Sequence, residues 1–161
     1  MNRSGTKITK YGIEFDSMLE LDLYEEFTNR GLRIVRGVPI PVSDSITVQF
    51  QCYTNDNKAN KFKLESNKIK DIKYTPDFII DIADANRHSR TVYIEAKGFA
   101  NETFRYRWKL FKKWLSENDP NALVFLIKRK HNGRVKPKDN ELRIQETKQI
   151  VDNIINIINN G

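Results

Sequence analysis

Two short apolar segments near the middle of the chain constrain its fold most. The residues from Tyr74 to Ile82 and from Thr91 to Ala96 are rich in isoleucine, valine and aromatic side chains, which favour β-strands. Between them, Asp84 to Arg90 is polar and typical of a turn, so the simplest connection is an antiparallel hairpin. The sequence therefore predicts a β-sheet at the centre of the fold.

Three segments have the periodicity of amphipathic helices. Ser17 to Asn29 places apolar residues every four positions, and Gly31 is expected to end that helix. A second helix is predicted from Asn101, a good N-cap, to about Glu117. The third is expected at about residues 142–158, where an isoleucine-rich band is wider than one packing face needs.

The remaining segments complete an α/β arrangement. Leu32 to Val42 and Ala122 to Ile127 are expected to be strands, and Ser45 to Leu64 contains a hairpin with a turn at Thr54–Asn60. We expect one domain over residues 1–161, with a core at about 15–128, an insertion at about 45–71 and the C-terminal helix. The predicted fold is a central mixed β-sheet flanked by helices, plus an inserted β-hairpin.

Composition excludes several classes of protein. Cys52 is the single cysteine, so a disulfide framework is excluded, and we expect its side chain to be buried. Apolar residues make up 39% of the chain, too many for a disordered polyelectrolyte. No apolar run approaches the roughly 18–20 residues that span a bilayer. We therefore expect a soluble, cytoplasmic protein with no membrane partner.

Charge is distributed unevenly along the chain. Residues 1–30 carry 4 basic and 6 acidic side chains, whereas residues 97–138 carry 12 basic and 3 acidic ones. A basic surface attracts nucleic-acid phosphates, and the predicted second helix has a basic face that would follow a DNA backbone. The alternative is a solvated face that serves solubility. The residues of this basic face are Arg105, Lys109, Lys112 and Lys113.

A small set of charged residues lies at the ends of adjacent predicted elements. Asp77 opens the first apolar strand, whereas Glu95 and Lys97 are two residues apart near the end of the second and so project from one face. Glu20 lies on the first helix. Such carboxylates could converge on Mg²⁺ or Mn²⁺, beside a lysine that acts on a phosphate. This is the arrangement of a phosphodiesterase.

These residues resemble a known nuclease motif. Pro76-Asp77 followed by Glu95-Ala96-Lys97 resembles the PD-(D/E)XK motif of restriction-type nucleases. The strings Phe15–Glu20, Tyr74–Phe78 and Glu95–Gly98 are similar to those of the phage endonuclease I branch, which resolves branched DNA such as Holliday junctions. The insertion and the terminal helix have no counterpart that we can place.

The resemblance implies a restriction-endonuclease-like core and a role for each motif residue. It implies metal ligands at Asp77, Glu95 and the carbonyl of Ala96, with Glu20 as an additional carboxylate and Lys97 as the catalytic lysine. The implied activity is Mg²⁺-dependent endonucleolytic cleavage of branched or structured DNA, leaving 5′-phosphate ends, by a phage or mobile-element protein. Mn²⁺ is the expected substitute for Mg²⁺.

The residues themselves leave alternatives open. Ser17-x-x-Glu20 also reads as a capping box, and Glu95 with Lys97 could be an ion pair on a solvated sheet face. The DNA could instead be a specific duplex or a transposon end, or the chain could be a basic DNA-binding protein without catalysis. The apolar band at 142–158 could form a homodimer or dock on its own sheet.

Overall fold

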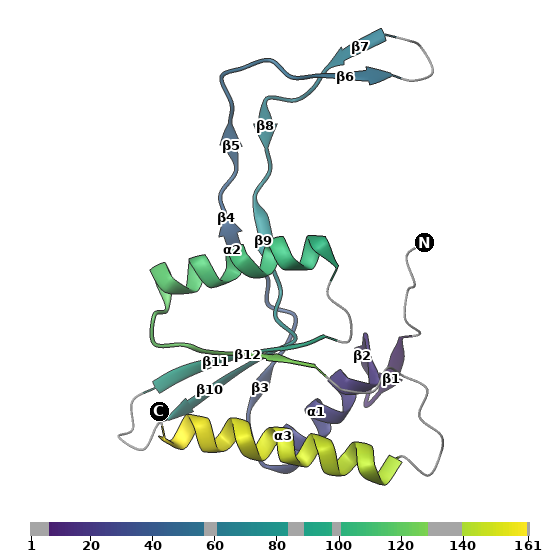
Figure 1. Ribbon diagram of the computed structural model, residues 1–161, viewed down its shortest axis with the longest axis vertical. Coiled ribbons are helices and arrows are strands. Elements are labelled where there is room, and N and C mark those ends of the chain that lie inside the picture. The colour runs from purple at the N-terminus through teal and green to yellow at the C-terminus, as the bar shows by residue number, and fades with distance from the viewer. Residues whose placement is uncertain (1–6, 57–60, 84–88, 98–100, 129–139, 161) are drawn as a thin grey trace. The chain divides into compact units, whose positions relative to one another are not determined.

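The computed structural model describes residues 7–56, 61–83, 89–97, 101–128 and 140–160 (Figure 1). The chain divides into two compact units. The sheet unit comprises Met1–Val38, Pro76–Asn101 and Pro120–Gly161, and the arm unit comprises Pro39–Thr75 and Glu102–Asp119. The sequence predicted one domain and gave no sign that the second helix groups with the insertion.

The sheet unit is built on a mixed four-stranded sheet, as the sequence predicted. Its strand order is β12-β11-β10-β3, in which β11 and β12 are parallel and the other pairs are antiparallel. The hairpin predicted between the two apolar segments is confirmed as β10 and β11. The strand bounds are β3 Ile34–Val35, β10 Phe78–Ala83, β11 Ser89–Ala96 and β12 Leu123–Ile127.

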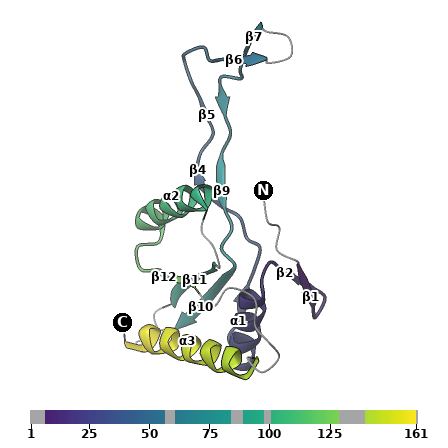
Figure 2. The same cartoon turned by 45° about the vertical axis from the view of Figure 1, so that its right-hand side comes forward.

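Two helices, α1 (Met18–Asn29) and α3 (Asn140–Asn160), pack on one face of this sheet (Figures 1 and 2). Burial of apolar side chains from both helices and the sheet is the main source of stability here. In the described residues the apolar band of α3 is used in part, because Leu142, Ile144 and Ile157 stay exposed. A homodimer through α3 therefore remains a prediction. The fully or nearly buried members of this core are Leu19, Leu23, Phe27, Phe78, Ile80, Val92, Ile94, Ile127, Val151, Ile154 and Ile158.

The ends of α1 follow from local chemistry. The Ser17 hydroxyl accepts a hydrogen bond from the Glu20 N–H at 3.2 Å, which caps the first turn. Gly31 follows the last turn with φ +72°, a conformation that glycine adopts without steric strain. Both signals were readable in the sequence, and the helix lies where it was predicted.

The sequence did not predict the hairpin that precedes α1. Strands β1 (Ile8–Lys10) and β2 (Ile13–Phe15) are antiparallel and are joined by Tyr11 and Gly12. Both linking residues have positive φ, 58° and 71°, as two-residue hairpin turns of type I′ require. A tyrosine at the first turn position is an uncommon signal, which is why the pattern was missed.

The arm unit contains a long two-stranded ribbon. Three antiparallel ladders follow one another along it: β4 (Ile40–Ser43) with β9 (Ile72–Tyr74), β5 (Ile46–Thr47) with β8 (Lys68–Ile69), and β6 (Tyr53–Asp56) with β7 (Lys61–Leu64). Further hydrogen bonds link the ladders, from Val48 N–H to Asn67 O and from Glu65 N–H to Cys52 O, each 2.8 Å. The ribbon's two strands lie side by side in both views (Figures 1 and 2).

The base of this ribbon packs on α2 (Glu102–Asn118), the predicted second helix. Tyr74 stacks on Phe111 with ring centroids 4.5 Å apart, and Trp108 lies beside both rings. Ile40 and Val42 of β4 are buried as well. This aromatic cluster gives the arm unit a small core of its own.

Four predictions about local structure need correction. The single strand expected from Leu32 to Val42 is two strands, β3 and β4, which belong to different sheets. The single strand expected from Tyr74 to Ile82 is two strands, β9 and β10, because Pro76 has no N–H to donate and interrupts the ladder. The predicted turn at Thr54–Asn60 begins later, since β6 continues to Asp56. Cys52 is exposed on the arm rather than buried.

In the described residues, no helix is long and apolar enough to cross a membrane.

Candidate active site

Asp77 and Glu95 are brought opposite each other by the central hairpin. Phe78 pairs with Ile94 in the register of β10 and β11, so the preceding Asp77 lies across from the following Glu95. The Ala96 N–H donates a hydrogen bond to Asp77 Oδ2 at 2.7 Å, which fixes the aspartate against the end of β11. The break at Pro76 thus frees Asp77 from the ladder and lets its carboxylate bond to the neighbouring strand.

Lys97 completes the cluster at the same end of the sheet. Its Nζ lies 3.7 Å from Glu95 Oε1, which confirms that the two side chains share a face. The Lys97 N–H donates to the Ile127 carbonyl at 2.8 Å and so holds this residue against β12. Glu95 is 5% exposed, whereas the Lys97 side chain is 35% exposed and can reach a ligand in solvent.

The pKa of Asp77 is raised to about 7 from its ordinary value of 3.8. Burial is the largest cause, since it disfavours the charged form, and the charge of Glu95 is the second. The Ala96 N–H acts in the opposite direction, Glu20 raises the pKa further and Lys97 lowers it. Asp77 and Glu95 therefore form a pair of mutually repelling carboxylates, and a bound cation would relieve that repulsion.

Glu20 is held by other groups. The Ser17 hydroxyl caps the helix as a capping box requires, but Glu20 Oε2 accepts from the Asp16 N–H at 2.7 Å rather than from the Ser17 N–H, so the predicted capping box forms in part. The Arg36 guanidinium pairs with Glu20 Oε1. Among the described residues, no group of three or more His, Cys, Asp or Glu is arranged to hold a metal ion. The structure thus brings Asp77, Glu95, Ala96 and Lys97 together. Glu20 makes its contacts elsewhere, and its negative charge raises the pKa of Asp77.

Arg36 is the residue of this region that the sequence did not indicate. Its guanidinium carbon lies 4.4 Å from the centroid of the Phe15 ring and 5.6 Å from that of Phe78, which directly follows Asp77. Its side chain is 21% exposed, and that of Glu20 is 6% exposed. The partners are far apart in sequence, so no local pattern could have predicted the pair.

We expect Arg36→Ala to lower the free energy of unfolding by about 2–3 kcal/mol, because it leaves the buried Glu20 carboxylate without its counter-charge. Glu20→Gln should lower it by only ~1 kcal/mol, since the oxygen of a glutamine can still accept from the Asp16 N–H. Urea unfolding of both variants measures the difference. A smaller loss for Arg36→Ala than for Glu20→Gln would contradict this account of the pair.

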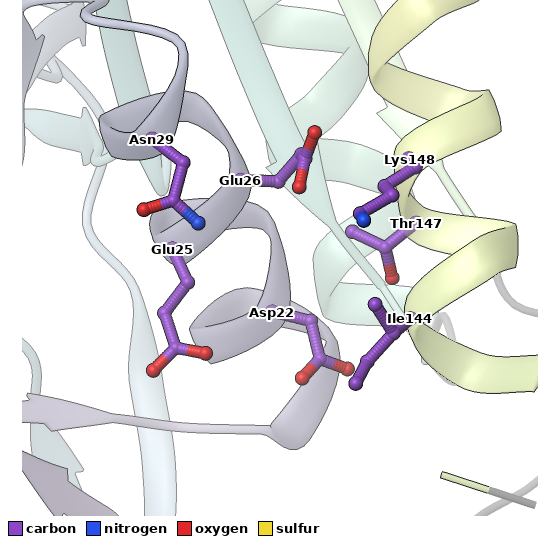
Figure 3. Close-up of a pocket in the computed structure, with 7 residues that line it drawn as sticks. All are labelled: Asp22, Glu25, Glu26, Asn29, Ile144, Thr147 and Lys148. Carbon is purple, nitrogen blue, oxygen red and sulfur yellow. The ribbon is translucent and has the colours of Figure 1, made fainter. Parts of the chain in front are cut away.

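The other carboxylates of α1 are engaged in structural contacts. Figure 3 shows Asp22, Glu25 and Glu26 on α1 beside α3, around a pocket that Lys148 also lines. Asp22 Oδ2 lies 3.3 Å from Arg143 Nε, and Glu26 Oε1 lies 2.8 Å from Arg30 Nε. Glu25 pairs with Lys10 and accepts from the Tyr11 hydroxyl at 2.9 Å. The acidic residues of α1 therefore form ion pairs with neighbouring elements, Asp22 with α3 and Glu25 with β1.

The four basic residues proposed for DNA binding are exposed on α2, in the arm unit. Lys113 Nζ lies 3.4 Å from Glu117 Oε1, whose carboxylate partly offsets its charge. The basic stretch that follows Lys128 lies outside the described residues. These four residues are Arg105, Lys109, Lys112 and Lys113.

Comparison with known proteins gives one family. A family model described as a protein of unknown function, DUF1064, matches residues 2–129. The chain belongs to this family. The DUF1064 match includes Glu20, Asp77, Glu95 and Lys97 and most of the sheet unit, but it stops before α3. No curated protein and no solved structure matches the chain.

Proposed function

We propose that this chain is a metal-dependent DNA endonuclease with a restriction-endonuclease-like core. The observation that carries the proposal is the pairing of Asp77 with Glu95, with the Ala96 N–H donating to Asp77 at 2.7 Å and Lys97 Nζ 3.7 Å from Glu95. The motif resemblance supports the same assignment. A buried carboxylate and a half-buried one beside a partly exposed lysine suit phosphodiester chemistry better than a structural ion pair does.

The donor set fits a hard divalent cation. Asp77 and Glu95 would hold Mg²⁺ or Mn²⁺ through carboxylate oxygens, together with the carbonyl oxygen of Ala96. Glu20 is the additional carboxylate that the resemblance implies, and its charge already acts on Asp77. A bound Mg²⁺ would polarise a phosphoryl oxygen and lower the pKa of a bound water.

The protein groups then position the reacting atoms. The Lys97 ammonium stabilises the charge that develops on the phosphate and orients the attacking water. The water oxygen forms a bond to phosphorus as the bond from phosphorus to the 3′ oxygen breaks, and a proton passes to that leaving oxygen. The products are a 5′-phosphate end and a 3′-hydroxyl end.

Branched or otherwise structured DNA is the proposed substrate, with α2 following the phosphate backbone through Arg105, Lys109, Lys112 and Lys113. The rivals are a nuclease for a specific duplex or transposon end and a basic DNA-binding protein without catalysis. The last of these accommodates the structural contacts of Glu20 equally well. It gives no role to the placement of Asp77 opposite Glu95 and of Lys97 Nζ 3.7 Å from Glu95.

Cleavage of a four-way junction, compared with a linear duplex of the same sequence, tests the proposal. With Mg²⁺ we expect the junction to be cut at least about tenfold faster, and chelation of the metal should stop both reactions. End-labelling of the products reports the 5′-phosphate. Equal rates on both substrates would favour the duplex nuclease, and no cleavage of any DNA with Mg²⁺ or Mn²⁺ would refute the enzyme.

A further inference from the structure

The distal part of the ribbon, residues 44–56 and 61–70, exposes large apolar side chains and lysines. We call this segment, beyond the α2 contact, the arm tip. Its large apolar side chains are exposed rather than packed, with Phe62 at 73% and Tyr53 at 53%. An isolated two-stranded ribbon gains little stability from such residues. Their exposure together on one segment therefore indicates a binding surface. The apolar residues concerned are Ile46, Phe50, Tyr53, Phe62, Leu64 and Ile69.

The charges of the ribbon are divided between its two strands. The outgoing strand, residues 39–56, contains no lysine or arginine, whereas the returning strand, residues 61–73, contains five lysines and two acidic residues. All five lysines are exposed. Neighbouring lysines two residues apart are separated by about 7 Å along a strand. The returning strand therefore presents a line of positive charge.

The pairing register of β6 and β7 places the side chains of the arm tip on two opposite faces of the ladder. Tyr53 pairs with Leu64 and Asn55 with Phe62, so the side chains of Tyr53, Phe62 and Leu64 share one face of the β6–β7 ladder. Thr54 pairs with Lys63 and Asp56 with Lys61, which places both lysines on the other face. Aromatic groups interleaved with lysines along one ribbon are the combination that binds unstacked nucleic-acid bases and their phosphates.

We propose that the arm tip is a nucleic-acid contact, in which the lysines of the returning strand bind phosphates and Phe62 stacks on an exposed base. A two-stranded ribbon has the dimensions to enter a DNA major groove. Charge favours a polyanion over a second copy of the chain that is joined through the returning strand. A symmetric dimer joined through the returning strand would place its line of lysines against the same line of lysines on the partner. The choice of ligand rests on the proposed nuclease function.

Binding of a labelled four-way junction by the full chain, measured by fluorescence anisotropy in EDTA over a series of salt concentrations, tests this contact. The variant Lys63→Gln/Lys68→Gln/Lys70→Gln is expected to bind at least about tenfold more weakly at 100 mM salt. For this variant, the slope of log affinity against log salt concentration should be smaller in magnitude by about 2–3. Each lost phosphate contact removes ~0.9 from that slope. The charge-matched control is Lys7→Gln/Lys10→Gln/Lys148→Gln, which should keep the wild-type slope.

Phe62→Ala is expected to weaken junction binding at least about fivefold and to leave the salt slope unchanged, since stacking involves no counterion release. An arm variant that binds with the slope of the control would overturn the proposal. So would a change in sedimentation mass between the wild type and the arm variant without DNA, because it would assign the tip to a second copy.

The two proposals can fail separately. Binding in EDTA requires no cleavage, so an inactive protein could still show the arm effect. Conversely, metal-dependent cleavage that is lost in Glu95→Gln, combined with normal binding by the arm variant, would retain the nuclease and refute the arm contact.

Discussion

Asp77→Asn and Glu95→Gln are each expected to reduce Mg²⁺-dependent cleavage of DNA at least about a thousandfold. Each change keeps the shape of the side chain and removes one anionic oxygen donor, and a bound metal contributes several kcal/mol of transition-state stabilisation. Lys97→Met should reduce the rate about a hundredfold or more, since it removes the cation beside the phosphate. Single-turnover cleavage of the junction measures all three.

Asp81→Asn is the matched control for these variants. Asp81 lies in β10, four positions after Asp77, which directly precedes that strand, and Asp81 is exposed. This change removes the same charge from β10 and should leave the rate within about twofold of the wild type. Retained cleavage by Asp77→Asn, or an equal loss in Asp81→Asn, would contradict the assigned roles.

Asp77 is also expected to make the metal-free protein less stable as pH rises. Its pKa in the folded protein, about 7, lies above the ordinary value of 3.8, so the folded state keeps a proton that the unfolded chain has released. The free energy of unfolding therefore falls as pH rises between about 4 and 7, and the loss is complete above that range. At about 1.4 kcal/mol for each pKa unit, the full loss from this group is ~4 kcal/mol.

Asp77→Asn removes this titration, because an amide stays neutral. From pH 5 to pH 8 the stability of the variant relative to the wild type should increase by about 2–3 kcal/mol, measured by urea unfolding in EDTA. Parallel stability curves for the two proteins would show that Asp77 ionises normally. A gain in stability together with a loss of cleavage would identify a residue retained for function.

Local sequence signals predicted much of the sheet unit. The helix at Met18–Asn29 followed from its cap and its glycine stop, and the hairpin of β10 and β11 followed from two apolar segments around a polar turn. The same hairpin predicted that Asp77 and Glu95 would meet, because antiparallel strands set the start of one beside the end of the other. Each of these predictions depended on residues close together in the sequence.

Other features depended on contacts that no local pattern encodes. The pairing of Glu20 with Arg36 depends on how β3 and α1 pack, and the Ser17-x-x-Glu20 pattern alone could not reveal it. The extent of the arm and the grouping of α2 with it depend on stacking of Tyr74 on Phe111. Exposure of Cys52 was missed because cysteine is usually buried, whereas here it lies on a ribbon with little core of its own.

Calorimetric titration of the protein with Mn²⁺ tests the central claim most directly, because it asks whether Asp77 and Glu95 share a cation without requiring the correct DNA. We expect saturable binding by the wild type and by Asp81→Asn, and binding weakened at least about a hundredfold in both Asp77→Asn and Glu95→Gln. Unchanged affinity in those two variants, or no binding by the wild type, would contradict the claim.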